Sequence, residues 1–100
     1  MEPATVLYNF MDMVWEDPRI GPSHISLFVA ILVQKRDSKK EILIPPAIVK
    51  IMKMAKICSK KTYYKCIRDL NDCGYIVYIP SNNPNKESII NLKFSHIRIS

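Results

Sequence analysis

The chain has 100 residues, of which 48% are hydrophobic and 24% charged, and its formal net charge is +6 with a pI near 9.3. This length and composition predict one compact domain with a packed core and exclude an intrinsically disordered chain. The longest apolar stretch, Ile25 to Val33, is shorter than the roughly 20 residues that a bilayer span requires. No basic and apolar signal sequence opens the chain, so we expect a cytosolic protein without a membrane partner.

A first helix is predicted over Thr5 to Asp17, and it ends before Pro18, which restricts the residue that precedes it. Apolar residues recur along this segment at helical spacing and predict one buried side. The opposite side of the helix is acidic. The residues predicted to be buried are Val6, Leu7, Phe10, Met13 and Val14.

A second helix is predicted from Ser23, a suitable N-cap, to about Arg36. Its apolar residues occupy more of the circumference than one contact surface needs, so this helix requires two packing partners. We expect residues 1–20 to supply the second partner, or another subunit to do so. Residues 21–100 would then form the main domain.

A short strand is predicted at Glu41 to Ile44, followed by a third helix. Proline is tolerated in the first turn of a helix, so the third helix begins near Pro46 and ends near Ala55. Only Lys56 to Cys58 separate it from the next helix, with Ile57 as an apolar anchor. Two short helices joined this tightly have the spacing of a helix-turn-helix.

The strongest helix signal lies between Ser59 and Cys73. Ser59 suits the N-cap because its hydroxyl can accept a hydrogen bond from an amide of the first turn. Gly74 suits the left-handed residue that ends a helix, and the run Tyr75 to Ile79 predicts a strand directly after it. The helix has two chemically different sides. Tyr63, Cys66, Ile67, Leu70 and Cys73 share the apolar side, and Lys61, Tyr64, Lys65 and Arg68 share the opposite side.

The C-terminal part of the chain predicts a β-hairpin. Pro80 to Ser88 is rich in turn-forming residues, and Ile89 to Phe94 alternates apolar and polar residues as a strand does. The Glu41 to Ile44 strand can join this hairpin at the edge of the sheet. The predicted fold class is therefore α+β, with three to four helices and a small antiparallel sheet of two to three strands.

Basic residues are concentrated in the third and fourth helices. The segment from Lys50 to Arg68 has no acidic residue, whereas residues 1–17 contain no Lys or Arg. This asymmetry favours a polyanion as partner of the basic segment. The alternative is a solvated helix surface whose lysines serve only solubility. The basic residues of the segment are Lys50, Lys53, Lys56, Lys60, Lys61, Lys65 and Arg68.

Catalytic and metal-binding signals are weak. Cys58, Cys66 and Cys73 are spaced by eight and seven residues, which matches neither a zinc site nor a redox motif, so we predict small buried apolar residues. His24 and His96 have no acidic neighbour in the sequence that would indicate a relay. No nucleophile with a base, paired carboxylates or phosphate-binding loop is evident, and we therefore expect no enzyme activity, no metal and no cofactor.

The order helix, helix, strand, helix, helix, strand, loop, strand resembles the winged helix-turn-helix family with an added leading helix. The pattern S-x-x-T-x-x-x-x-I-x-x-L-x-x-x-G-Y-I, from Ser59 to Ile76, is similar to the recognition helix and following strand of bacterial winged-helix regulators. H-I-S-L-F from His24 and P-S-N-N-P from Pro80 resemble short regulators of bacterial mobile elements. The turn at Lys56 to Cys58 lacks the glycine that many members of the family have, which leaves the angle between its helices open.

The resemblance implies a non-catalytic transcriptional regulator that binds double-stranded DNA, with helix 59–73 in the major groove and the loop after Ile79 as the wing. Arg68 is the best base discriminator, because a guanidinium can donate two hydrogen bonds to guanine. The wing carries little charge, so it either contacts phosphates or is a plain hairpin loop. The side chains expected to face bases are Lys60, Lys61, Tyr64, Lys65 and Arg68. Those expected to contact phosphates are Lys50, Lys53, Lys56, Ser59, Thr62, Asn82, Asn83, Asn85 and Lys86.

One small module rarely gives strong specificity, so we expect a two-fold homodimer, associated with the nucleoid in the cytoplasm, that contacts half-sites about 34 Å apart. No small-molecule substrate is evident. Two alternatives stay open. A winged-helix body can serve as a protein-assembly module, or it can belong to a replication initiator, because such initiators share the same motif.

Overall fold

The structure, a computed structural model, describes residues 3–38, 42–44, 48–80 and 88–92. Within these ranges the chain forms four helices and three strands, so the predicted α+β class is confirmed. The predicted helices and strands are present, with boundaries that shift by a few residues. In chain order they are α1 (Pro3–Val14), α2 (Pro22–Ser38), β1 (Ile42–Ile44), α3 (Ile48–Ala55), α4 (Lys60–Asp72), β2 (Ile76–Ile79) and β3 (Ser88–Leu92).

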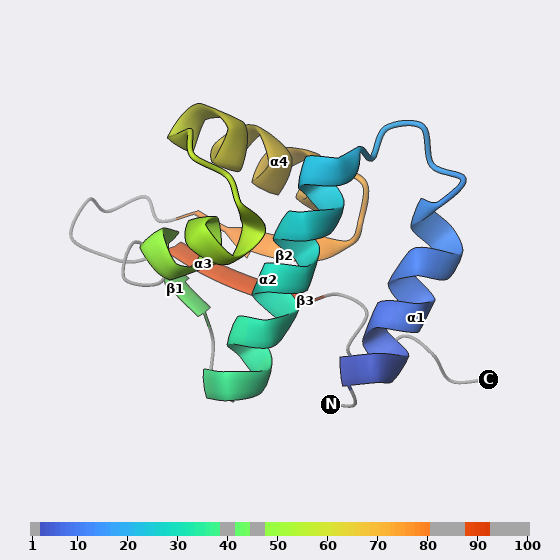
Figure 1. The fold of residues 1–100 in the computed structure, drawn as a ribbon, viewed down its shortest axis with the longest axis horizontal. Helices are drawn as coiled ribbons and strands as arrows, with labels where there is room; N and C mark the ends of the chain where they lie inside the picture. Colours follow the sequence, from blue (N-terminus) through green and yellow to red (C-terminus); the bar gives the residue numbers. More distant parts are fainter. Residues whose placement is uncertain (1–2, 39–41, 45–47, 81–87, 93–100) are drawn as a thin grey trace.

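Helix α2 lies at the centre of the molecule (Figure 1). Helices α1 and α3 pack on opposite sides of it, the sheet lies behind it, and α4 packs near its N-terminal end. This arrangement supplies the two packing partners that its broad apolar surface requires. Leu27, Phe28 and Ile31 are fully buried as a result. None of the described helices is both long and apolar enough to cross a membrane.

The three strands form one antiparallel sheet in the order β1-β3-β2. Ile42 pairs with Ile90, and Ile76 pairs with Leu92. The short strand β1 is thus the third member of the sheet, at its edge, as the sequence predicts. Ile76, Ile90 and Leu92 are buried and supply the side of the sheet that faces the helices.

Helix α1 shares the hydrophobic core with the rest of the protein. Its buried residues are Val6, Phe10 and Val14, and the Phe10 ring stacks on the Phe28 ring of α2 with centroids 3.7 Å apart. The Tyr75 ring meets Phe10 edge-on at 5.3 Å. The prediction that Met13 is buried is wrong, because the buried residues repeat every four positions and leave Met13 55% exposed on another side of the helix.

The connection between α1 and α2 is tied to the start of β2 by Asp17. Its carboxylate accepts two hydrogen bonds from the Arg19 side chain, at 2.8 and 2.9 Å, and one from the Tyr75 hydroxyl at 2.7 Å. These bonds favour the charged form and hold the pKa of Asp17 far below its usual value. Burial, together with the bond to Asp17, raises the pKa of Tyr75 to about 12.

Helix α4 ends in the way that its sequence predicts. Gly74 has a φ of 87°, and the N–H of Tyr75 donates to the Leu70 carbonyl at 2.9 Å, which is the pattern of a Schellman C-cap. Strand β2 begins directly after this turn. Near the end of α4, the Asn71 side-chain oxygen accepts a hydrogen bond from the Tyr78 N–H at 3.0 Å, so the helix supplies an acceptor to an edge strand.

Candidate nucleic-acid interface

The connection between α3 and α4 is a tight turn without glycine. Lys56 has a φ of 62°, in the left-handed region that favours glycine. Its N–H donates to the Lys53 carbonyl at 3.2 Å, and the Ile57 N–H donates to the Met52 carbonyl at 3.0 Å. These two bonds form a Schellman motif, so Lys56 occupies the position that a glycine usually takes. Ile57 is buried and anchors the turn as predicted.

Two side-chain hydrogen bonds fix the helices on either side of this turn. The Ser59 hydroxyl accepts from the Thr62 N–H at 3.3 Å, which confirms Ser59 as the N-cap of α4. The Ser26 hydroxyl donates to the Ala55 carbonyl at 2.9 Å and fastens the end of α3 to α2. The start of α4 is therefore held in one orientation relative to the body of the protein.

Helix α4 has one buried and one exposed side, divided as the sequence predicts. The buried residues are Tyr63, Cys66, Ile67 and Leu70. Tyr64 is 39% exposed, and its ring meets the Tyr63 ring edge-on at 5.0 Å. The exposed side carries Lys60, Lys61, Tyr64, Lys65 and Arg68, all five of the side chains expected to face bases.

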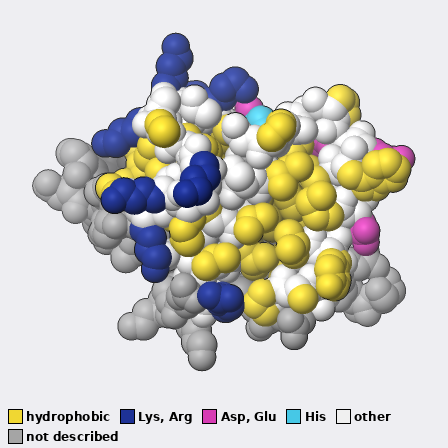
Figure 2. Space-filling view, in the orientation of Figure 1, with side chains coloured by type: hydrophobic (Ala, Val, Ile, Leu, Met, Phe, Trp, Pro, Cys, Tyr) yellow, Lys and Arg dark blue, Asp and Glu magenta, His cyan; other side chains and the backbone are white. Residues whose placement is uncertain are grey.

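The exposed side of α4 is continuous with basic residues of α3 and the turn. Lys and Arg side chains project from the end of the molecule formed by α3 and α4, whereas the acidic side chains lie mainly over α1 (Figure 2). Charge is thus separated in space as well as in sequence. The residues predicted to contact phosphates that lie here are exposed, namely Lys50, Lys53, Lys56, Ser59 and Thr62. The other four, Asn82, Asn83, Asn85 and Lys86, lie outside the described residues.

One of the exposed lysines is held by a neighbouring carboxylate. Lys65 Nζ lies 2.9 Å from Asp69 Oδ2, and the same oxygen lies 2.8 Å from Nε2 of His24. The hydrogen bond from His24 and the charge of Lys65 lower the pKa of Asp69, and the Asp69 carboxylate raises the pKa of Lys65. A ligand that uses Lys65 must therefore compete with Asp69 for it.

The contact between His24 and Asp69 corrects the expectation that His24 lacks an acidic neighbour. The Gly21 N–H donates to His24 Nδ1 at 2.9 Å, so this nitrogen is the acceptor, and the proton lies on Nε2 and points at Asp69. His24 is buried, at 8% exposed. It links α2 to α4 across 45 residues of sequence, which no local pattern indicates.

The prediction that all three cysteines are buried is correct only for Cys66. Cys58 is exposed and Cys73 is half-buried. The reason for Cys58 is that the neighbouring Ile57 occupies the buried position in the turn and leaves Cys58 on the solvent side. Burial raises the pKa of the Cys66 thiol. Within the described ranges no group of His, Cys, Asp and Glu side chains has the arrangement that would hold a metal ion.

Comparison of this chain with models of protein families, with curated proteins and with solved structures finds no match.

Proposed function

We propose that this protein is a winged helix-turn-helix regulator of transcription that binds duplex DNA without catalysis and places α4 in the major groove. A single observation carries the proposal: α4 buries Tyr63, Ile67 and Leu70 in the core while Lys61 and Arg68 stand on its exposed side. An α-helix fits the width of the major groove, and a helix with one cationic side can approach both bases and phosphates there. The predicted homodimer and wing are part of this proposal.

The side chains divide by the kind of contact that each can make. Arg68 is assigned to guanine, since its guanidinium can donate two hydrogen bonds to the N7 and O6 acceptors. Lys53 and Lys56 are assigned to phosphates, which add affinity without discriminating between sequences. Lys65 can contact a base after its ion pair with Asp69 is broken. The Ser59 hydroxyl already accepts a bond from Thr62, but its proton can still be donated to a phosphate oxygen.

The test is a titration of fluorescently labelled duplexes with the protein at several salt concentrations. Fluorescence anisotropy of the duplex measures the affinity at each concentration. Contact with about 4 to 6 phosphates per protomer gives a slope of log affinity against log salt of roughly −4 to −5. Arg68→Ala is expected to cost about 1 to 3 kcal/mol on a site selected from random duplexes, and less on random DNA.

Arg36→Ala is the matched control, because Arg36 is an exposed arginine in the last turn of α2, at the end of that helix far from α4 (Figure 1). It is expected to leave the preference for the selected site unchanged. An Arg68→Ala protein with the full preference would remove Arg68 from base contact. If random duplex at low salt does not bind at all, the proposed function is wrong.

A further inference from the structure

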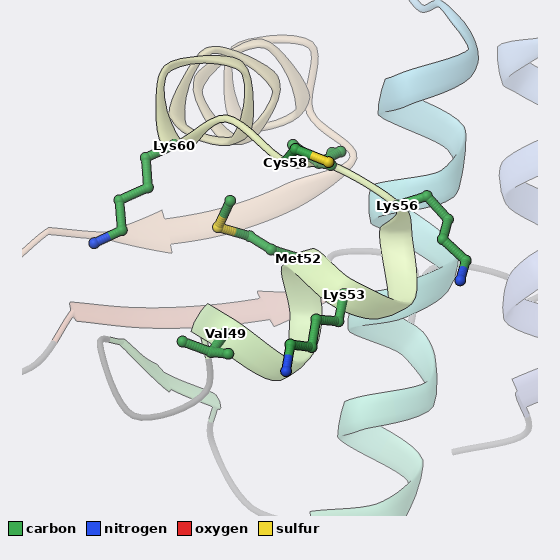
Figure 3. Close-up of a pocket in the computed structure, with 7 residues that line it drawn as sticks. Val49, Met52, Lys53, Lys56, Cys58 and Lys60 are labelled. Carbon is green, nitrogen blue, oxygen red and sulfur yellow. The ribbon is translucent and has the colours of Figure 1, made fainter.

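The helices α3 and α4 border an open groove with an apolar floor and a basic rim (Figure 3). Its volume is about 590 Å³, within the range of sites that receive a ligand or an inserted side chain. Met52 extends from α3 toward the start of α4, and the exposed Val49 continues the apolar surface outward. The lysines that line the groove are Lys53, Lys56 and Lys60.

Helix α1 carries an exposed aromatic and acidic stripe. Tyr8 and Trp15 are 67% and 71% exposed, and Asp12 lies between them on the same side of the helix. Trp15 directly follows the last residue of α1, and its backbone N–H donates to the Met11 carbonyl at 3.2 Å, so the helical geometry continues through Trp15. The exposed Glu16 comes next. Spacings of four and seven residues are those of helices that insert side chains into a groove.

The stripe and the groove are complementary in chemistry. The stripe offers two aromatic rings, with Asp12 between them and Glu16 after the second, and the groove offers an apolar floor bordered by lysines. They cannot meet within one molecule, because α1 is fixed on α2 by the stacked Phe10 and Phe28 rings, on the side of α2 opposite to α3 (Figure 1). A second molecule removes this constraint.

We propose that the groove between α3 and α4 binds the Tyr8–Trp15 stripe of a second copy of this chain. Trp15 is the aromatic anchor, which is the residue type that most often dominates an interface, and it inserts over Met52. Asp12 and Glu16 then face the lysines of the rim. This proposal uses the exposed side chains of two surfaces and does not depend on DNA binding.

Two variants separate the two halves of the contact. Tyr8→Ala with Trp15→Ala removes the stripe and keeps the groove, whereas Lys53→Glu with Lys56→Glu reverses the rim and keeps the stripe. The parent protein is expected to self-associate at low salt in sedimentation equilibrium, and each variant alone to associate at least about tenfold more weakly. Because each variant retains the half that the other lacks, their mixture is expected to form a complex with one copy of each.

Fluorescence identifies the contact within the mixture. Trp15 is the single tryptophan of the chain, so in the mixture only the Lys53→Glu/Lys56→Glu variant shows tryptophan emission. Its emission is expected to move to shorter wavelength when the Tyr8→Ala/Trp15→Ala variant is added, because the indole leaves water. Far-UV circular dichroism and thermal unfolding verify that both variants are folded.

Two control variants make the same kinds of substitution outside the stripe and the groove. Met13→Ala removes an exposed apolar side chain from a different side of α1, and Lys50→Glu with Lys61→Glu reverses two exposed lysines that do not line the groove. Both controls are expected to associate like the parent. A parent protein that stays monomeric at low salt and high concentration overturns the proposal. So does a mixture that stays monomeric, or a loss of association in the lysine control as large as in Lys53→Glu/Lys56→Glu.

Discussion

At the scale of single residues, Lys56 occupies a backbone conformation that favours glycine. A side chain with a Cβ in the left-handed region costs about 1 to 2 kcal/mol, and the φ of 62° places Lys56 in that region. Lys56→Gly is expected to be more stable than Lys56→Ala by about 1 kcal/mol, because both changes remove the same charge and only glycine removes the Cβ. Urea unfolding of the two variants measures this difference. If the urea unfolding curves of Lys56→Gly and Lys56→Ala had equal midpoints and slopes, the turn would carry no strain at Lys56.

Single residues also show which parts of the candidate site are predictable from sequence. Ser59 and Gly74 are predictable because capping depends on residue type and on position relative to a periodic apolar pattern. Lys56 in a left-handed conformation is not predictable in this way, since its residue type gives no signal. The bond between His24 and Asp69 is also hidden from sequence, because it depends on how α2 and α4 pack.

At the scale of elements, Asp17 connects the α1–α2 linker to strand β2 through the Tyr75 hydroxyl. Because folding lowers the pKa of Asp17 from an ordinary value of about 3.9, its contribution to stability is fully present above pH about 4. It is lost as the pH falls from there through the folded-state pKa. We therefore expect Asp17→Asn to be less stable than the parent at neutral pH, and the difference to shrink below pH about 4.

Thermal unfolding of both proteins across this pH range tests the expectation. Asp72→Asn is the matched control, because Asp72 is an exposed carboxylate of α4 that belongs to neither proposed interface. An exposed side chain of this kind is expected to change the free energy of unfolding by less than about 0.5 kcal/mol. A stability difference for Asp17→Asn that stays constant down to the lowest pH would show that the carboxylate charge is not what holds the linker.

The elements themselves follow from local patterns, and their exact packing does not. The four helices and three strands of the described ranges were predictable because apolar periodicity and turn residues mark each of them. Met13 was assigned to the wrong side of α1, since an apolar residue at helical spacing can lie at the border of the buried stripe. The stacking of Phe10 on Phe28 determines which residues of α1 are buried. Because this is a contact between two helices, the sequence of α1 alone does not reveal it.

At the scale of the whole molecule, Lys53 and Lys56 belong to two proposals at once. They are proposed phosphate contacts, and they also line the groove proposed to bind a second copy. The same ammonium groups cannot serve both partners fully. We therefore expect duplex DNA to dissociate the assembly formed through the groove, which is a different contact from the two-fold homodimer proposed to bind DNA half-sites. Dissociation is seen as a return of Trp15 emission to longer wavelength. An equal charge concentration of a short polyphosphate is the control for simple screening, and an assembly that keeps its Trp15 emission on saturated DNA would contradict this competition.

The hydrogen bond from Tyr78 to Asn71 has a consequence for the behaviour of the protein at high concentration. Among the described strands, β2 lies at the edge of the sheet. An edge strand with unpaired N–H groups is a template on which strands of other chains can add, which is the first step toward fibrils. The side-chain oxygen of Asn71 accepts a hydrogen bond from one of these N–H groups, that of Tyr78. We therefore expect the last turn of α4 to oppose the addition of further strands along β2, next to the half-exposed Ile79, whose apolar side chain favours such addition.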